Sequence, residues 1–74
     1  MDFYWELKKA AEQGQEAFKR LRDESWKDGR LVHLLRHLAE NQRSDANARR
    51  VTAMLFEHLT AEQQAFFHRC EQAA

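Results

Sequence analysis

The chain has 74 residues, with 12 acidic and 12 basic side chains, so its formal net charge at pH 7 is zero. Balanced charge is atypical of a dedicated nucleic-acid-binding protein, and a single cysteine excludes an intramolecular disulfide and a cysteine-rich zinc site. The length predicts a single helical domain, residues 1–74, near the lower limit for a self-sufficient core. Proline is absent and helix-forming residues dominate, which predicts an all-α fold: a small bundle of three or four helices.

The first predicted helix covers residues 2–22 and carries the strongest pattern in the chain. Apolar or small residues recur there with the 4-3-4-3-4 spacing of a heptad seam: Phe3, Leu7, Ala10, Gly14, Ala17 and Leu21. We expect this helix to lie along a second helix, and we predict a homodimer that uses the seam. Glycine inside a helix costs roughly 1 kcal/mol relative to alanine. Gly14 therefore indicates either close approach of another helix or a packing accommodation within one chain.

Aromatic side chains fall off the predicted apolar faces at three positions. Tyr4 flanks the seam, Trp5 projects toward Lys8, and Phe56 projects away from the stripe of its own helix. Either the helices of a small bundle surround these rings, or the rings contact a protein partner, because interface centres are rich in aromatic residues and arginine. The partner-binding residues that we predict are Tyr4, Trp5, Phe56, Arg36, Arg49 and Arg50.

A polar connection is expected over residues 23–29, with Ser25 or Asp28 capping the helix that follows. That second helix is predicted over residues 30–42, because leucines recur on one face: Leu31, Leu34, Leu35 and Leu38.

A third helix is predicted over residues 46–59, with Ser44 or Asp45 as its cap. No glycine or proline forces a break after residue 42, so the second and third helices can also be continuous. Thr60 and Gln63 form a capping box that begins a fourth helix burying Phe66, Phe67 and Cys70. The core residues that we predict are Leu7, Leu21, Leu31, Leu35, Leu38, Val51, Leu55 and Phe66.

Histidine supplies the only pattern that suggests chemistry. His33 and His37 share a helix face at a metal-chelating spacing, but Arg36 lies beside them and no further ligand is identified. His58 projects into an apolar stripe, as a hydrogen-bonded core or interface histidine or as a pH-sensitive interface contact. We predict no catalytic residue, no metal site and no cofactor.

These observations favour a small non-enzymatic protein-interaction module, an adaptor or an inhibitor that occupies the surface of a larger partner. Such proteins are frequent among phage and bacterial regulators. We expect it in the cytoplasm, because the chain has one cysteine, starts without a signal-peptide pattern and lacks the ~20-residue apolar run of a membrane span.

The alternative is a helical nucleic-acid-binding transcriptional regulator. The third and fourth predicted helices could form a helix-turn-helix that directs Gln64, His68 and Arg69 toward bases. The charge of this segment disfavours binding to nucleic acid, because residues 51–74 carry three acids and one arginine. The more basic surface is Arg36, Arg43, Arg49 and Arg50. A metalloprotein or enzyme built on the two spaced histidines is the third and least supported reading.

Overall fold

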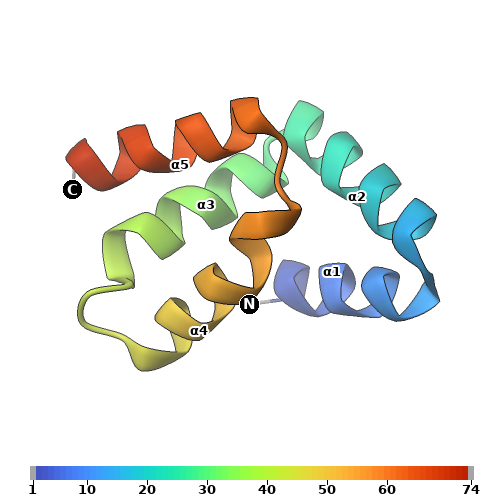
Figure 1. Ribbon diagram of the computed structural model, residues 1–74, viewed down its shortest axis with the longest axis horizontal. Helices are drawn as coiled ribbons and strands as arrows, with labels where there is room; N and C mark the ends of the chain where they lie inside the picture. The colour runs from blue at the N-terminus through green and yellow to red at the C-terminus, as the bar shows by residue number, and fades with distance from the viewer. Residues whose placement is uncertain (1, 74) are drawn as a thin grey trace. The chain divides into compact units, whose positions relative to one another are not determined.

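The computed structural model describes residues 2–73, with side chains from residue 3, and every regular element in that range is helical (Figure 1). The all-α prediction is therefore confirmed. The elements are α1 (Asp2–Gln13), α2 (Gln15–Asp28), α3 (Arg30–Asn41), α4 (Ala46–Leu55), the 3₁₀ helix η1 (Phe56–His58) and α5 (Ala61–Ala73). The described range thus has five α-helices where the sequence predicts three or four.

Internal contacts divide the chain into two units, residues 1–34 and 35–74, and the boundary falls inside α3. The single domain expected from the length stays a prediction. Among the described residues, no helix is both long enough and apolar enough to cross a lipid bilayer.

In the first unit, the helix predicted over residues 2–22 is interrupted at Gly14, so the prediction of one continuous helix is wrong. Gly14 has φ 122° and ψ 169°, a backbone region that is essentially restricted to glycine. This single residue ends α1 and lets α2 leave in a new direction (Figure 1). A Cβ added at Gly14 would meet no atom within 4 Å. Glycine therefore serves the bend here, and close approach of another helix is not its role in this conformation.

The connection expected over residues 23–29 is also wrong, because α2 continues to Asp28. Ser25 lies fully buried within the helix, and its hydroxyl donates to the carbonyls of Leu21 (2.6 Å) and Arg22 (3.0 Å). It is therefore no cap. Gly29, with φ 94°, alone joins α2 to α3, and its N–H donates to the Ser25 carbonyl (3.1 Å).

In the second unit, local capping signals set the helix starts as predicted. Asp45 caps α4 by accepting the N–H groups of Asn47 (2.9 Å) and Ala48 (3.5 Å). At the start of α5, the Thr60 N–H donates to Gln63 Oε1 (2.9 Å), and the Gln63 N–H donates to Thr60 Oγ1 (3.2 Å). This confirms the capping box. Gln63 is only 1% exposed, so the box lies in the interior.

The third predicted helix ends earlier than expected, at Leu55, and residues 56–58 form the tighter η1. A 3₁₀ helix advances 120° per residue rather than 100°. This change rotates His58 out of the predicted apolar stripe, and 59% of its side chain is exposed. The prediction of a core position for His58 is wrong. Leu59, just beyond, is buried instead.

Most predicted core residues are buried, with exposures of 6% or less: Leu7, Leu31, Leu35, Leu38 and Leu55. Leu21, Val51 and Phe66 are only half-buried. Phe67 is 3% exposed, as predicted for α5, whereas Met54 of α4 is 59% exposed.

Candidate functional site

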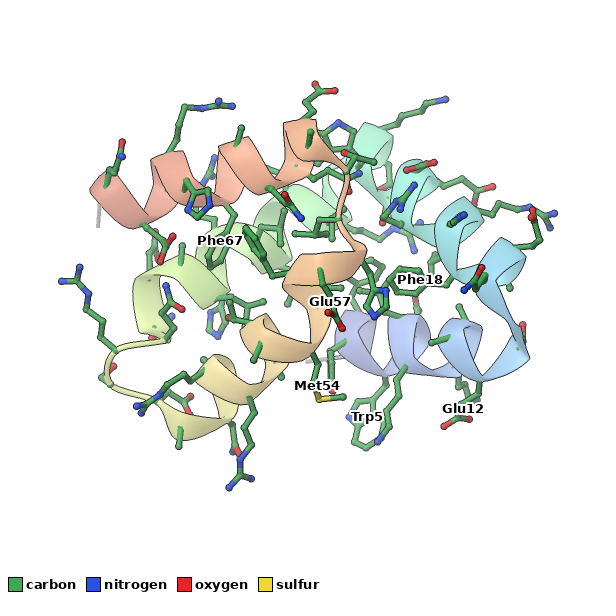
Figure 2. The ribbon with its side chains drawn as sticks, in the orientation of Figure 1. Trp5, Glu12, Phe18, Met54, Glu57 and Phe67 are labelled. Carbon is green, nitrogen blue, oxygen red and sulfur yellow. The ribbon has the colours of Figure 1, made fainter. Side chains whose placement is uncertain are left out.

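A projecting aromatic surface on α1 consists of Tyr4, Trp5 and Lys8, here called the Trp5 surface. Trp5 is 60% exposed, and Figure 2 shows its indole pointing away from α1 and α2. The Tyr4 ring lies beside it, with ring centroids 6.3 Å apart and planes tilted by 57°. Lys8, one turn along the helix, holds its Nζ 5.0 Å from the Trp5 ring centroid. The ring is therefore outward-facing and partly ordered by its neighbours, as the helical projection predicts.

A second feature of the first unit is a groove of about 340 Å³ between α1 and α2. Its apolar floor is Ala10, Ala17 and Leu21, three of the predicted seam residues. Charged side chains of both signs border it, two from each helix: Glu6 and Lys9 from α1, Arg20 and Glu24 from α2. We call this feature the α1–α2 groove.

The break at Gly14 distributes the rest of the seam differently. Leu7 is 2% exposed, Phe3 is half-buried, and Gly14 itself is exposed at the bend. The seam is therefore not one continuous stripe in this conformation, but two shorter stripes that meet at the bend.

Arg30, the first residue of α3, contacts side chains of both α1 and α2. Its Nη1 lies 3.3 Å from Glu6 Oε2, its Nη2 lies 2.8 Å from Asp28 Oδ2, and its guanidinium carbon lies 5.3 Å from the Phe3 ring centroid. We call these four residues the Arg30 cluster. The Asp28 carboxylate also accepts the Arg30 N–H (3.0 Å), so Asp28 occupies the predicted capping place before α3. The Arg30 guanidinium lowers the pKa of Asp28, chiefly by its side-chain hydrogen bond, and the Asp28 carboxylate raises the pKa of Arg30, chiefly by the same bond. No local signal marks this cluster, because it joins positions 6 and 30.

Phe56, predicted to bind a partner, packs within the second unit. Its ring makes edge-to-face contacts with Phe67 (centroids 5.7 Å apart) and His68 (5.2 Å). Its carbonyl accepts a hydrogen bond from Gln64 Nε2 (2.9 Å). Of the two alternatives for Phe56, the structure shows packing against a neighbouring helix, and its contact with a partner stays an untested prediction.

The predicted arginines of the second unit, Arg36, Arg49 and Arg50, are exposed, as is Arg43. Among residues 3–73, none of these four takes part in an ion pair. They leave a set of uncompensated positive charges over α3, the following turn and α4.

Apart from His58, the histidines divide into two groups. His33 and His37 are exposed, and the described residues contain no group of three or more His, Cys, Asp or Glu side chains that could hold a metal ion. His68 lies 2.9 Å from Glu71 Oε1, and the second carboxylate oxygen of Glu71 accepts from Gln42. The three-residue spacing of His68 and Glu71 on one helix could have revealed this pair in the sequence.

The described residues offer three surface features: an exposed indole with a neighbouring ammonium, a groove with an apolar floor, and four unpaired arginines. Surface features of these kinds are the ones by which proteins recognise other molecules, through contact area and charge. No protein-family model matches the chain, and neither a curated protein nor a solved structure matches it significantly.

Proposed function

We propose that this chain is a small non-enzymatic protein-interaction module, an adaptor or an inhibitor that covers part of a larger partner in the cytoplasm. The observation that carries the proposal is the 60% exposure of Trp5 on a helix whose opposite side is buried at Leu7. Exposing a tryptophan gains a monomer nothing, whereas tryptophan is the residue most enriched among the side chains that dominate binding energy.

The Trp5 surface also supports a specific partner chemistry. Lys8 and Tyr4 restrict the indole before binding, which reduces the entropy lost when it is buried. The Lys8 ammonium places a positive charge beside the ring. The matching partner surface is an apolar pocket bordered by a carboxylate.

Affinity capture from the lysate of the source cell tests this proposal, with wild type and Trp5→Ala in parallel. Glu12→Ala is the matched control, because Glu12 lies one heptad further along α1 and also points outward (Figure 2). The proposal predicts a protein that wild type and Glu12→Ala retain and Trp5→Ala loses. Identical captured sets for all three proteins would exclude the Trp5 surface as the binding site.

We further propose that the module forms homodimers through its seam residues, three of which line the α1–α2 groove of the single chain. Three seam residues form its apolar floor, and acidic and basic side chains border it together, so the surface is complementary to itself. A small domain buries a low fraction of its surface alone and gains stability from a second copy. Light scattering checks this: a mass of 8.8 kDa across the micromolar range would contradict the homodimer.

Nucleic-acid binding is a second candidate, supported by the four unpaired arginines of α3, the following turn and α4. The helix-turn-helix version has less support, because its three proposed base-reading residues are engaged within α5 and η1. Gln64 donates to the Phe56 carbonyl, His68 pairs with Glu71, and Arg69 lies 5.9 Å from the Phe66 ring centroid. An electrophoretic shift at low and moderate salt, compared between wild type and Arg49→Gln/Arg50→Gln, tests this candidate.

A further inference from the structure

We propose that Gly14 is a hinge at which two copies of the chain exchange α1. In the exchanged form, α1 and α2 straighten into one helix, and this helix pairs antiparallel with the same helix of the second copy. The inference rests on the proposed homodimer and specifies its geometry.

The hinge is a single residue with an unusual backbone. Gly14 joins α1 and α2 alone, at φ 122° and ψ 169°, and no side chain caps the start of α2. Its N–H makes only a short-range bond to the Ala11 carbonyl (3.2 Å). The first N–H groups of a helix have no partner within it. If the bend straightened, the N–H groups of residues 14–17 would bond the carbonyls of residues 10–13.

The sequence keeps its register across this bend. The heptad spacing runs from Phe3 to Leu21 without a stutter, although the structure divides it between two helices. We consider an antiparallel pair of these helices whose two-fold axis passes beside residue 12. Each seam residue of one copy then lies opposite a seam residue of the second copy, and we call each such pair a layer. In every layer, one residue precedes the bend and the other lies at or after it. The layers are Phe3 with Leu21, Leu7 with Ala17, and Ala10 with Gly14. The bulky Leu7 is thus opposite a small residue, and the smallest pair lies nearest the axis.

The charges beside the seam fit the same arrangement. With Leu7 as heptad position a, Glu6 and Arg20 both occupy position g. Antiparallel helices place g beside g, so Glu6 of each copy lies beside Arg20 of the other. Both side chains border the α1–α2 groove in the single chain, where Glu6 pairs with Arg30. Among the described residues, Arg20 forms no ion pair. Exchange therefore supplies the counter-charge that Arg20 lacks.

The exchanged dimer leaves the Trp5 surface available. Trp5 occupies heptad position f, on the outside of a two-helix pair. Dimerisation and partner binding therefore use opposite sides of α1 and are separable by mutation.

Charge reversal tests the antiparallel pairing. Glu6→Arg places arginine opposite arginine at both ends of the dimer, and Arg20→Glu places glutamate opposite glutamate. Each variant alone should raise the dimer Kd about tenfold or more, whereas an equimolar mixture should form a heterodimer of near wild-type affinity. Glu12→Arg and Lys19→Glu are the matched controls, because they make the same charge changes at outward f positions and should leave Kd unchanged. A mixture that dimerises no better than the single variants would overturn the antiparallel pairing.

Gly14→Ala tests the hinge. Alanine is strained at the observed φ. Inside a helix it is favoured over glycine, which raises the equilibrium constant for straightening by about fivefold in each copy. Sedimentation equilibrium should therefore show a dimer Kd lowered roughly 25-fold, with increased helical circular dichroism. An unchanged or higher Kd would overturn the hinge.

A spin-label distance separates exchange from simple docking. The double variant Lys8→Cys/Lys27→Cys, in a Cys70→Ser background, carries a spin label on each cysteine. It is mixed with excess unlabelled protein, so that the measured distance lies within one chain. A straight helix separates the two backbone positions by roughly 29 Å, whereas the bent chain holds them closer because Arg30 contacts Glu6. A dimer that keeps the short distance overturns the exchange and leaves the homodimer standing. If neither wild type nor Gly14→Ala dimerises, the homodimer and the exchange both fail, while capture through Trp5 is unaffected.

Discussion

The guanidinium of Arg30 lies 3.3 Å from the carboxylate of Glu6, and this contact ties the start of α3 to the first half of α1. The same guanidinium lies over the Phe3 ring and binds Asp28. One side chain at the α2–α3 junction thus contacts the element on the other side of the Gly14 bend.

Arg30→Gln should loosen α1 without unfolding the chain. All charged members of the cluster are exposed, so the global free energy of unfolding should change little. The local opening of α1 should become more frequent, because the contact with Phe3 and Glu6 is lost. Amide hydrogen exchange of residues 3–12 measures this effect. Arg43→Gln removes an exposed, unpaired arginine and should leave these rates as in wild type.

Acid should weaken the Arg30 cluster through Asp28. Its pKa lies below the ordinary value of 3.8 because Arg30 donates to the carboxylate. The unfolded chain therefore binds this proton at higher pH than the folded chain does. The stabilisation is complete above the unfolded value, begins to fall as pH drops below that value, and is lost as pH falls through the lower folded pKa. Urea unfolding between about pH 5 and pH 3 should show a smaller loss of stability in Asp28→Asn than in wild type. Equal losses would mean that this pair does not affect folding.

Gln63→Ala should destabilise the chain by about 1–3 kcal/mol. It removes the acceptor for the Thr60 N–H and truncates a side chain that is 1% exposed. Gln72→Ala is the matched control, because it removes the same side chain from an exposed position of α5. Urea unfolding of both variants measures the difference. Equal stabilities would show that the capping box contributes nothing.

Leu35→Ala should cost about 2–5 kcal/mol, the usual range for a buried leucine. Leu35 is 1% exposed, whereas Met54 is 59% exposed, so Met54→Ala should stay within about 0.5 kcal/mol of wild type. Because small domains have little stability to lose, the leucine variant should unfold without a cooperative transition. Thermal circular dichroism distinguishes the two outcomes.

The sequence correctly predicted the features that depend on interactions between residues close together in the chain. The Asp45 cap, the Thr60 and Gln63 box, and the leucine face of α3 are all set by residues within one helical turn of each other. Each appears in the structure where the sequence indicates it.

The failures arise where a small local energy competes with packing. An interior glycine costs only about 1 kcal/mol, so the seam around Gly14 predicts a continuous helix. The bend accompanies the contact between positions 6 and 30, which no local pattern records. Ser25 is read as a connection residue because serine favours caps, yet its hydroxyl bonds inside α2 and leaves no polar group for solvent.

The candidate site was predictable in part. Helical projection places Trp5 beside Lys8 and away from the seam, as the structure has it. The same projection failed at His58, because it assumes 100° per residue through a segment that tightens to a 3₁₀ turn. The α1–α2 groove could not be derived from the sequence, since it exists only because the helix bends at Gly14.

At its two glycines the backbone adopts a sign of φ that D-residues favour and L-residues disfavour. Gly14 and Gly29 both hold positive φ, and the place that an L-side chain would take is open at each. An L-alanine there opposes the bend through its backbone preference alone. A D-alanine has the mirror-image preference and favours the same positive φ. A synthetic protein with D-alanine at position 14 should therefore stay a bent monomer under conditions in which its L-alanine diastereomer dimerises, although the two molecules have identical composition, charge and apolar area.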